Sequence, residues 1–398
     1  MEKEKVIVMF GGKSAEHDIS IITGLQTLKN VDREKYDVFP VYLSREGEMF
    51  FGKKLENINT YFNFNSKNLK KVTFKTGSKN IFLGNGKTFK KWFEVGCVIL
   101  CCHGLNGEDG TIQGLFELCE IPYTSPNVLS SSICMDKIIM KDVLRANLIK
   151  TPDSFSFKKT DFYFNEKEIL NEIEKKLGLF ENFCFVKPAN LGSSIGISKC
   201  KTREELEEAI NVAGNYDERI IVEKSIENAT EVNCAVLGNA DYQIASNLEY
   251  PTSWSSFLNF EEKYILRNKA GNIIEENNKE EAEPKTKKQK KLSEKLESKV
   301  KEIAIKAFKI FNCSGVVRID FLVDKENEIV YLNELNSIPG SLSFYLFKDQ
   351  GFTFTKLINK LIDFSKKKMK DKLENKYSFS SNALVNFGAG NKMNKYTK

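Results

Sequence analysis

The sequence has no long apolar run and no recognisable leader segment. Its 398 residues are 41% hydrophobic, but no stretch approaches the roughly 18 consecutive apolar residues of a membrane-spanning helix. The apolar residues 6–10 are too few for the central region of a secretory signal peptide. We therefore expect a cytoplasmic protein with no membrane partner.

Cysteine pairs at metal-binding or redox spacing are also missing. The nine cysteines include no Cys-x-x-Cys motif, and several lie in apolar runs such as residues 97–102. An odd number without regular spacing does not predict a disulfide framework. We expect small buried side chains in a reducing compartment, and neither disulfides nor zinc ligands.

A strong excess of one charge is absent as well. The chain has 60 basic and 54 acidic residues, and its densest lysine runs lie at residues 285–291 and 366–372. A nucleic-acid-binding surface more often combines arginine, a basic stripe and interleaved aromatic residues. We interpret the lysine runs as solvated surface and expect no nucleic-acid partner.

Strand, helix and strand alternate in the first third of the chain. The pattern predicts a strand at residues 5–10, a helix at 19–28, and strands at 38–43 and 95–102. This alternation indicates an N-terminal α/β domain with a parallel sheet over residues 1–125. Residues 44–91 carry no pattern that assigns a structure.

The remainder alternates helices with short strands, so the fold class is α/β, or α+β overall. Helices are expected at residues 135–148, 203–212, 292–311 and 352–364, and strands at 232–237, 242–244, 316–323 and 329–334. The polar residues 265–291 are expected to form a mobile loop. We divide this part into a central unit (126–222), a C-terminal unit (223–370) and an unassigned basic tail (371–398).

Both histidines lie in glycine-rich loops that follow predicted strands. His17 comes shortly after Gly11 and Gly12, and His103 opens the segment HGLNGEDGTIQG. Ligand sites of α/β proteins gather at such strand ends. His103 is therefore a candidate site residue, with a structural role as the open alternative. His17 is interpreted as a surface residue.

A phosphate site is predicted where residues 186–196 read VKPANLGSSIG. Lys187 ends an apolar strand, and residues 192–194 form a turn whose backbone amides can bind phosphate. The Walker A pattern GxxxxGK[ST] is absent, because Ile81 stands at the first glycine position before residues 86–88. The predicted cradle is thus a β-hairpin and not a helix N-terminus.

Polar side chains also alternate on two neighbouring predicted strands. Arg318 and Asp320 share a face of the first, and Glu334 and Asn336 share a face of the second. Carboxylate and amide oxygens are the ligands that Mg²⁺ prefers. A cross-strand ion pair between Arg318 and Glu334 is the open structural alternative. Gly340, just beyond, can present a backbone amide to a developing oxyanion.

Together these segments resemble the D-alanine–D-alanine ligase family of the ATP-grasp superfamily. Eight motifs carry the resemblance in order: GGKSAEHDIS, HGLNGEDGTIQG, MDK, KPANLGSSIG, EKSI with Glu231, EEKY, RIDF and NELNSIPGS. The resemblance implies a two-domain ATP-grasp fold behind the N-terminal domain, with ATP between two antiparallel sheets. It also implies ligation of two D-alanine molecules through an acyl phosphate, for peptidoglycan precursor synthesis.

The resemblance further implies a role for each residue that matches a motif. Catalytic roles fall to Glu16, Ser193, Tyr264, Arg318 and Gly340, and first-substrate or second-substrate contacts to His103 and Ser341. ATP is expected to contact Lys137, Lys187, Gly192, Ser194, Glu223, Lys224, Ile226, Glu231 and Lys263. Two Mg²⁺ ions, for which Mn²⁺ could substitute, are expected on Asp320, Glu334 and Asn336.

One departure concerns the second substrate. The commoner family pattern has a serine for that substrate's carboxylate where Tyr345 stands here, so Ser341 or Ser343 are candidates for the role. Tyr264 favours alanine as second substrate, while D-serine or D-lactate stays an alternative, as does another ATP-grasp carboxylate–amine ligase. A non-catalytic nucleotide binder is disfavoured, because the phosphate lysines and the metal ligands are intact. The family also implies a homodimer.

Overall fold

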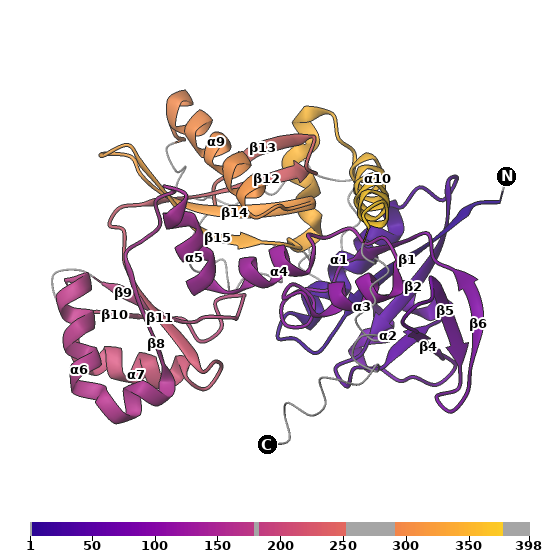
Figure 1. Ribbon diagram of the computed structural model, residues 1–398, viewed down its shortest axis with the longest axis horizontal. Helices are drawn as coiled ribbons and strands as arrows, with labels where there is room; N and C mark the ends of the chain where they lie inside the picture. Colours follow the sequence, from indigo (N-terminus) through magenta and orange to yellow (C-terminus); the bar gives the residue numbers. More distant parts are fainter. Residues whose placement is uncertain (1, 179–182, 252–290, 377–398) are drawn as a thin grey trace, which may run out of the picture.

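The computed structural model describes residues 2–178, 183–251 and 291–376. The chain passes in order through three β-sheets that lie in three separate parts of the molecule (Figure 1). Residues 265–290 of the expected mobile loop and residues 377–398 of the basic tail lie outside these ranges. Within the described ranges, no helix combines the length and the apolar character needed to cross a bilayer.

The N-terminal sheet has seven strands in the order β6-β5-β4-β3-β2-β1-β7. Its elements are β1 (Glu4–Gly11), α1 (His17–Asn30), β2 (Tyr36–Leu43), β3 (Met49–Phe51), η1 (Lys53–Glu56), α2 (Asn59–Phe62), β4 (Lys70–Phe74), β5 (Asn80–Gly84), β6 (Phe89–Glu94), β7 (Cys97–Leu100) and α3 (Thr111–Cys119). β1 pairs in parallel with β2 and β7, which confirms the predicted parallel part of the sheet.

The unassigned residues 44–91 supply most of the antiparallel half of this sheet. Strands β3 to β6 pair antiparallel in succession, so the sheet is mixed and not purely parallel. The rings of Phe39, Phe51, Trp92 and Phe93 pack together across it. Within residues 44–91, Phe50 also packs on Phe64, and Phe74 packs on Phe116, so aromatic contacts help to hold strands in a segment that shows no clean alternation of apolar and polar residues.

The predicted helix at residues 135–148 is confirmed as α5 (Lys137–Ala146), which begins two residues later. A further helix, α4 (Val128–Met135), directly precedes it and was not predicted. Asp136 between them has extended backbone, and its carboxylate accepts the amides of Ile138 and Ile139. Such side-chain caps start a helix, so α5 begins anew after the break.

The central sheet has four antiparallel strands in the order β10-β9-β11-β8, and α6 and α7 lie together on one side of it (Figure 1). Its elements are β8 (Ser154–Lys158), α6 (Lys159–Leu177), β9 (Cys184–Pro188), β10 (Ser198–Cys200), α7 (Arg203–Ala213) and β11 (Arg219–Lys224). The predicted helix at 203–212 is confirmed. A capping box between Thr202 and Glu205 fixes its start.

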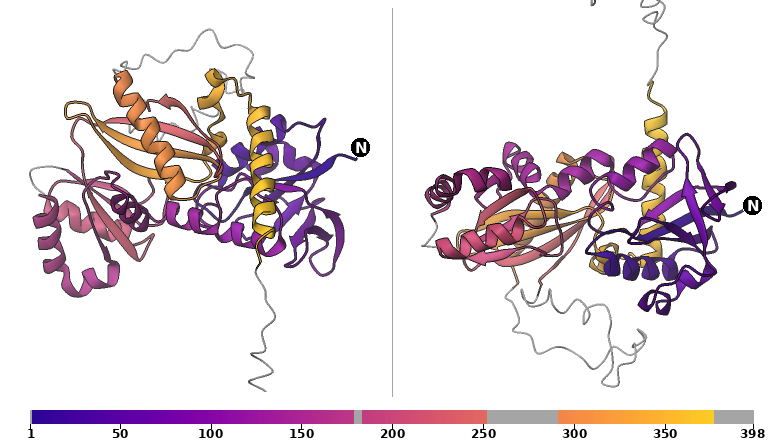
Figure 2. Two further views of the ribbon diagram at one scale, coloured as in Figure 1. Left: turned by 45° about the horizontal axis from the view of Figure 1, so that its top comes forward. Right: turned by 90° about the horizontal axis from the view of Figure 1, so that it is seen from below.

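The third sheet is also antiparallel, with strand order β13-β12-β14-β15. Its part of the chain comprises β12 (Thr230–Gly238), β13 (Gln243–Glu249), α9 (Glu294–Ile310), β14 (Gly315–Asp324), β15 (Ile329–Asn336), η3 (Gly340–Gln350) and α10 (Phe354–Leu373). α10 continues past the predicted end at residue 364 and runs beside the N-terminal domain (Figure 2).

The buried apolar residues form three clusters. The first joins the N-terminal sheet to α10 and to parts of the third sheet, and includes Val8, Ile99, Val316 and Leu361. The second lies between the third sheet, α9 and the helices α4 and α5. The third consists only of residues from β8 to β11 and their helices. All nine cysteines are free and buried, as the sequence predicts.

Candidate active site

Residues from all three sheets meet around Glu16. This carboxylate stands directly before α1, on the loop that follows Gly11 and Gly12. It interacts electrostatically with Lys137 at the start of α5, Arg318 on β14 and Glu334 on β15. Segments that the sequence singled out separately therefore form one site.

The hairpin between β9 and β10 reaches this site through Ser193. Its hydroxyl donates a hydrogen bond to Oε1 of Glu16. Ser193 and Ser194 both have left-handed backbone, with φ of 52° and 55°, a conformation that costs non-glycine residues free energy and is frequent at ligand sites. The structure thus confirms the predicted hairpin and brings its turn onto the N-terminal domain.

Glycines allow the loops to approach Glu16 closely. A Cβ on Gly104 would lie 2.7 Å from Oε2 of Glu16, and a Cβ on Gly192 would lie 3.0 Å from Oε1. Gly104 also has a φ of +70°, which side chains rarely adopt. Burial raises the pKa of Glu16, and the hydrogen bond from Ser193 opposes that rise. Loop packing therefore sets the electrostatic environment of this carboxylate.

Two buried lysines supply positive charge to the site: Lys137 interacts with Glu16, and Lys187 lies close enough to interact with Lys137. Lys137 is 6% exposed and donates to the backbone oxygen of Leu191, in the hairpin turn, at 2.5 Å. Lys187, also 6% exposed, donates to Oε2 of Glu223 at 2.7 Å. Burial lowers the pKa of Lys137. Two ammonium groups so close to a left-handed turn suit a ligand that carries several negative charges.

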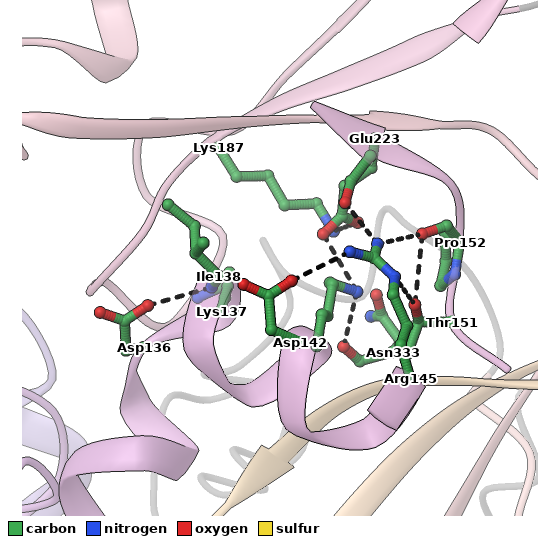
Figure 3. A network of polar contacts seen from close by, with 12 residues as sticks. Asp136, Lys137, Ile138, Asp142, Arg145, Thr151, Pro152, Lys187, Glu223 and Asn333 are labelled. Carbon is green, nitrogen blue, oxygen red and sulfur yellow. Dashed lines mark hydrogen bonds and ion pairs between the residues drawn. The ribbon is translucent and has the colours of Figure 1, made fainter. Parts of the chain in front are cut away.

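Glu223 is held by two lysines at once. Lys187 and Glu223 point toward each other in Figure 3, and Lys141 forms a second ion pair with Glu223 at 3.0 Å. Burial alone would raise the pKa of Glu223, but the charges of Lys141 and Lys187 outweigh it, so that pKa is about 2. Sequence reasoning missed Lys141, although its spacing of four residues from Lys137 places both on one face of α5.

The candidate metal ligands lie on the paired strands β14 and β15. Arg318 donates to both oxygens of Asp320 at 2.8 Å, and the Asn336 amide donates to Asp320 Oδ2 at 3.0 Å. Arg318 therefore pairs with Asp320 on its own strand, and the alternative pairing with Glu334 is wrong. Asp320 faces Glu334 across the strand pair.

These oxygens fit a hard cation by their chemistry. Two carboxylates and one amide come from adjacent strands, and carboxylate and amide oxygens are the donors that Mg²⁺ takes. In the part of the chain that the structure describes, however, no three acidic, cysteine or histidine side chains gather closely enough to form a metal site by themselves. Any bound ion must therefore take further ligands from substrate phosphates or water.

His103 holds a loop of the C-terminal unit. Its Nδ1 donates to the Ile338 carbonyl oxygen at 2.6 Å, so its Nε2 accepts the hydroxyl of Thr23 at 2.9 Å. Thr23 in turn accepts the backbone amide of Ser341 at 3.1 Å. Burial lowers the pKa of His103 to about 4. Both ring nitrogens thus contact protein, which supports a structural role, and the expected place of His103 near the first substrate stays a prediction.

Glu108 was not found by sequence reasoning and fixes the same loop. Its carboxylate accepts the amides of Gly104 at 2.9 Å and of Ile338 at 2.7 Å. Burial, and to a lesser extent the charge of Glu16, raises the pKa of Glu108 to about 8. The only signal in the sequence was its place between glycines of the HGLNGEDG segment. Its partner Ile338 lies 230 residues away.

His17 is buried and is not the surface residue that the sequence suggested. It is 3% exposed, and its ring nitrogens contact the Gly12 carbonyl oxygen and the Tyr42 hydroxyl. Its ring also packs edge-on against Tyr42. It therefore supports the glycine turn that leads to Glu16.

The turn after Gly340 is strained. Ser341, Leu342 and Ser343 have consecutive φ values of 52°, 50° and 47°, which are costly for residues with a side chain. The hydroxyls of Ser341 and Ser343 are buried without a hydrogen-bond partner in the described ranges. Tyr345 follows, and its hydroxyl donates to Glu249 on β13 at 3.1 Å. Strain and unpaired hydroxyls together mark this turn as a candidate ligand contact.

The remaining predicted residues divide into two groups. Lys224 ends β11 directly after Glu223, Ile226 lies in the connection to β12, and Glu231 lies on β12. Lys263 and Tyr264 lie outside the residues that the structure describes.

Comparison with known proteins gives a consistent result. The family model "D-ala D-ala ligase N-terminus" matches residues 5–126, and "D-ala D-ala ligase C-terminus" matches residues 143–363. A D-alanine–D-alanine ligase of Thermosipho melanesiensis is 42% identical over 370 residues, which cover 92% of this chain and 94% of that protein. One from Clostridium acetobutylicum is 39% identical and covers 91% and 97%.

Solved structures agree with the sequence relatives. The D-alanine–D-alanine ligase from Coxiella burnetii superposes with a TM-score of 0.74 and 28% identity, covering 94% of this chain and 97% of that one. The VanG D-Ala:D-Ser ligase from Enterococcus faecalis has a TM-score of 0.73 and 31% identity, covering 92% and 100%. The N-terminal sheet and the two antiparallel sheets behind it thus have solved counterparts.

Proposed function

The chain belongs to the D-alanine–D-alanine ligase family, and we propose that it joins two D-alanine molecules into D-alanyl-D-alanine while ATP is converted to ADP and phosphate. As a member of this family it is an ATP-dependent ligase of peptidoglycan precursor synthesis. The observation that carries the proposal is the contact of Glu16 with Ser193 beside Lys137 and Arg318.

The reaction proceeds in two transfers. A carboxylate oxygen of the first D-alanine attacks the γ-phosphorus of ATP, and the bond to ADP breaks. The amine of the second D-alanine then attacks the acyl carbon and loses a proton, and inorganic phosphate leaves. Phosphoryl transfer depends mostly on positioning and charge neutralisation, which buried lysines provide.

The nucleotide is assigned to the central hairpin and its surroundings. Lys137 and Lys187 bind the phosphates, together with the backbone amides of Gly192 and Ser194. Their burial favours this role, because a buried ammonium interacts more strongly with a phosphate than one in water. The remaining ATP contacts are Glu223, Lys224 and Ile226 at the adenine, Glu231 at the ribose and Lys263 at the γ-phosphate.

Two Mg²⁺ ions, or Mn²⁺ in their place, are assigned to Asp320, Glu334 and Asn336. When bound, they neutralise the phosphate oxygens and polarise the γ-phosphorus for attack. Arg318 pairs with Asp320 in the structure. It can turn from that carboxylate to the oxyanion that develops on the acyl carbon, which the Gly340 amide also faces in this proposal.

The first D-alanine is assigned to Glu16, which receives its ammonium group. Ser193, together with Tyr264, orients Glu16 and closes the site against water, because an acyl phosphate hydrolyses readily if water enters. The second substrate's carboxylate is assigned to the turn of Ser341 and Ser343, whose hydroxyls are buried and unpaired in the described part of the chain. His103 acts by holding that turn through Thr23.

Each of the three parts of the chain is assigned to one domain. Residues 1–125, 126–222 and 223–370 act as the N-terminal, central and C-terminal domains. The protein works in the cytoplasm, where ATP is available, and forms a homodimer. Its substrates are small molecules.

Phosphate release from Mg-ATP tests the proposal. Purified protein is mixed with D-alanine, L-alanine, D-serine or D-lactate, and product masses are read in parallel. Release that requires D-alanine and yields the dipeptide supports the assignment. A mixed product with D-serine or D-lactate would change the assignment of the second substrate. If none of the D-substrates stimulates phosphate release, the proposed reaction is refuted.

A further inference from the structure

Lys141 is a buried cation that the proposed reaction does not use. It lies one turn after Lys137 on α5, and its side chain is 1% exposed. Its ammonium group contacts Glu223 of β11 at 3.0 Å and the backbone oxygen of Asn333 on β15 at 3.0 Å. One lysine thus joins a strand of the central sheet to a strand of the third sheet.

The charges around Glu223 are unequal in number. Two ammonium groups share one carboxylate, with Lys187 at Oε2 and Lys141 at Oε1. All three side chains are at least nine-tenths buried, so an unpaired charge among them would be unfavourable. The two lysines differ in surroundings, because Lys141 has a second protein acceptor in Asn333.

The proposed function makes this difference important. If Lys187 binds the phosphates of ATP, it leaves Glu223. Without another partner, Glu223 would then be a buried carboxylate with no counter-charge, and it would hold Lys187 back. Lys141 stays in place because β15 and β11 both hold it.

We propose that Lys141 is a positioning residue that keeps Glu223 paired and oriented while Lys187 moves from that carboxylate to the nucleotide phosphates. This inference rests on the proposed ATP site. In this proposal Lys141 stays on Glu223 throughout, whereas Lys187 exchanges between Glu223 and the nucleotide phosphates. Glu223 is thereby ready for the adenine whether or not Lys187 is beside it.

The contacts of Lys141 also connect the proposed nucleotide site to β15, the strand that carries Glu334. Asn333 precedes Glu334 directly on β15. The contact of Lys141 with the Asn333 carbonyl oxygen therefore fixes the backbone next to a candidate metal ligand. Figure 3 shows Asn333 in the network that also contains Lys187 and Glu223. Loss of Lys141 should consequently disturb ATP binding more than D-alanine binding.

The test compares Lys141→Met with Lys141→Arg in the full-length enzyme. Steady-state kinetics give KM for ATP, KM for D-alanine and kcat, and binding of a fluorescent ATP analogue gives affinity without turnover. We expect Lys141→Met to raise KM for ATP at least about tenfold, because a buried charged group loses its partner. KM for D-alanine should stay within about threefold, and Lys141→Arg should recover most of the affinity because it keeps the charge.

A double-mutant cycle with Glu223→Gln separates positioning from general stability. Glu223→Gln removes the charge that Lys141 compensates, so adding Lys141→Met to it should change analogue affinity less than about threefold. Lys368→Met serves as the matched control, because Lys368 packs on Tyr123 and donates to the Ser125 carbonyl oxygen far from this network. It should lower Tm without changing KM for ATP.

Equal effects of Lys141→Met in both backgrounds, or an unchanged KM for ATP, would overturn the inference. If Lys141→Met does not fold, Lys141→Gln carries the same test, since it keeps a donor for Asn333 and removes only the charge. Failure of the wild type to bind the ATP analogue would instead refute the proposed function, which distinguishes the two.

Discussion

Ser193 and Glu16 are 177 residues apart in the sequence, yet the hydroxyl of one donates to the carboxylate of the other. Ser193 belongs to the central hairpin and Glu16 to the N-terminal domain, so this hydrogen bond connects the assigned phosphate loop with the assigned amino-acid site. If the hairpin binds nucleotide as proposed, Ser193 can thereby orient the carboxylate that is assigned to the first D-alanine.

Replacement of Ser193 by alanine tests this connection. A hydrogen bond to a charged group is worth about 1.5–3 kcal/mol, and the exposure of Ser193 favours the lower end. We expect kcat/KM for D-alanine to fall about tenfold, with little change in Tm. Ser198→Ala, on the following strand, is the control and should retain wild-type kinetics. Equal kinetics of both variants would contradict the role of Ser193.

Replacement of Lys187 by methionine should weaken nucleotide binding. Saturating Mg-ATP at about 100 times its Kd stabilises a protein by about 2.7 kcal/mol, and we expect most of the resulting rise in Tm to disappear in the variant. Lys199→Met is the matched control, since the Lys199 ammonium lies over the ring of Phe183 at 3.9 Å on the neighbouring strand. A full nucleotide-induced rise in Lys187→Met would exclude Lys187 from the site.

Metal removal and Glu334→Gln should have the same consequence. Chelation of Mg²⁺ should abolish phosphate release, and Glu334→Gln should lower kcat at least about 100-fold, because transition-state charge loses its neutralisation. Glu326→Gln, in the exposed turn between β14 and β15, is the control. Mg²⁺ titrations of activity compare the three proteins, and an unchanged metal requirement in Glu334→Gln would refute the assignment.

Acid should destabilise the protein partly through His103. Its pKa is about 4 in the folded state, below the ordinary value of 6.5, so the unfolded chain binds more protons between these values. The stability that neutral His103 contributes is complete above pH 6.5 and is lost as pH falls to 4. Its share of the slope is at most about 1.4 kcal/mol per pH unit.

His103→Gln cannot bind that proton and should show a smaller loss of stability over the same interval. Denaturant unfolding from pH 7.5 to 4 measures the difference between the two proteins. His17→Gln corrects for the other histidine, whose pKa burial also lowers. Parallel curves for wild type and His103→Gln would mean that His103 binds its proton as readily in the folded protein as in the unfolded chain, which contradicts a lowered pKa.

Short sequence patterns predicted the parts of the site that depend only on residues close together in the chain. The hairpin between β9 and β10 follows from an apolar strand that runs into Gly192, and the shared face of Arg318 and Asp320 follows from alternation. The partner of Arg318 could not be chosen from sequence, because a cross-strand glutamate and an aspartate two residues away satisfy the same pattern. Only the backbone register decides between them.

Long-range contacts explain the residues that were missed. Glu108 is recognisable only once Ile338 lies beside it, and Lys141 only once Glu223 and Asn333 surround it. Helix α4 was not predicted, although the start of α5, where the Asp136 carboxylate accepts the amides of Ile138 and Ile139, lies within two residues of the predicted helix start. In the N-terminal sheet, tertiary aromatic packing outweighs the weak local pattern of residues 44–91.

The unit from β8 to β11 has an apolar core of its own. Its cluster shares no residue with the other two, whereas the first and last parts of the chain share one core and would have to break it to separate. Polar contacts, such as those of Lys141 with Glu223 and of Asp136 with Arg219, therefore hold that unit to the rest of the molecule in place of a shared apolar core.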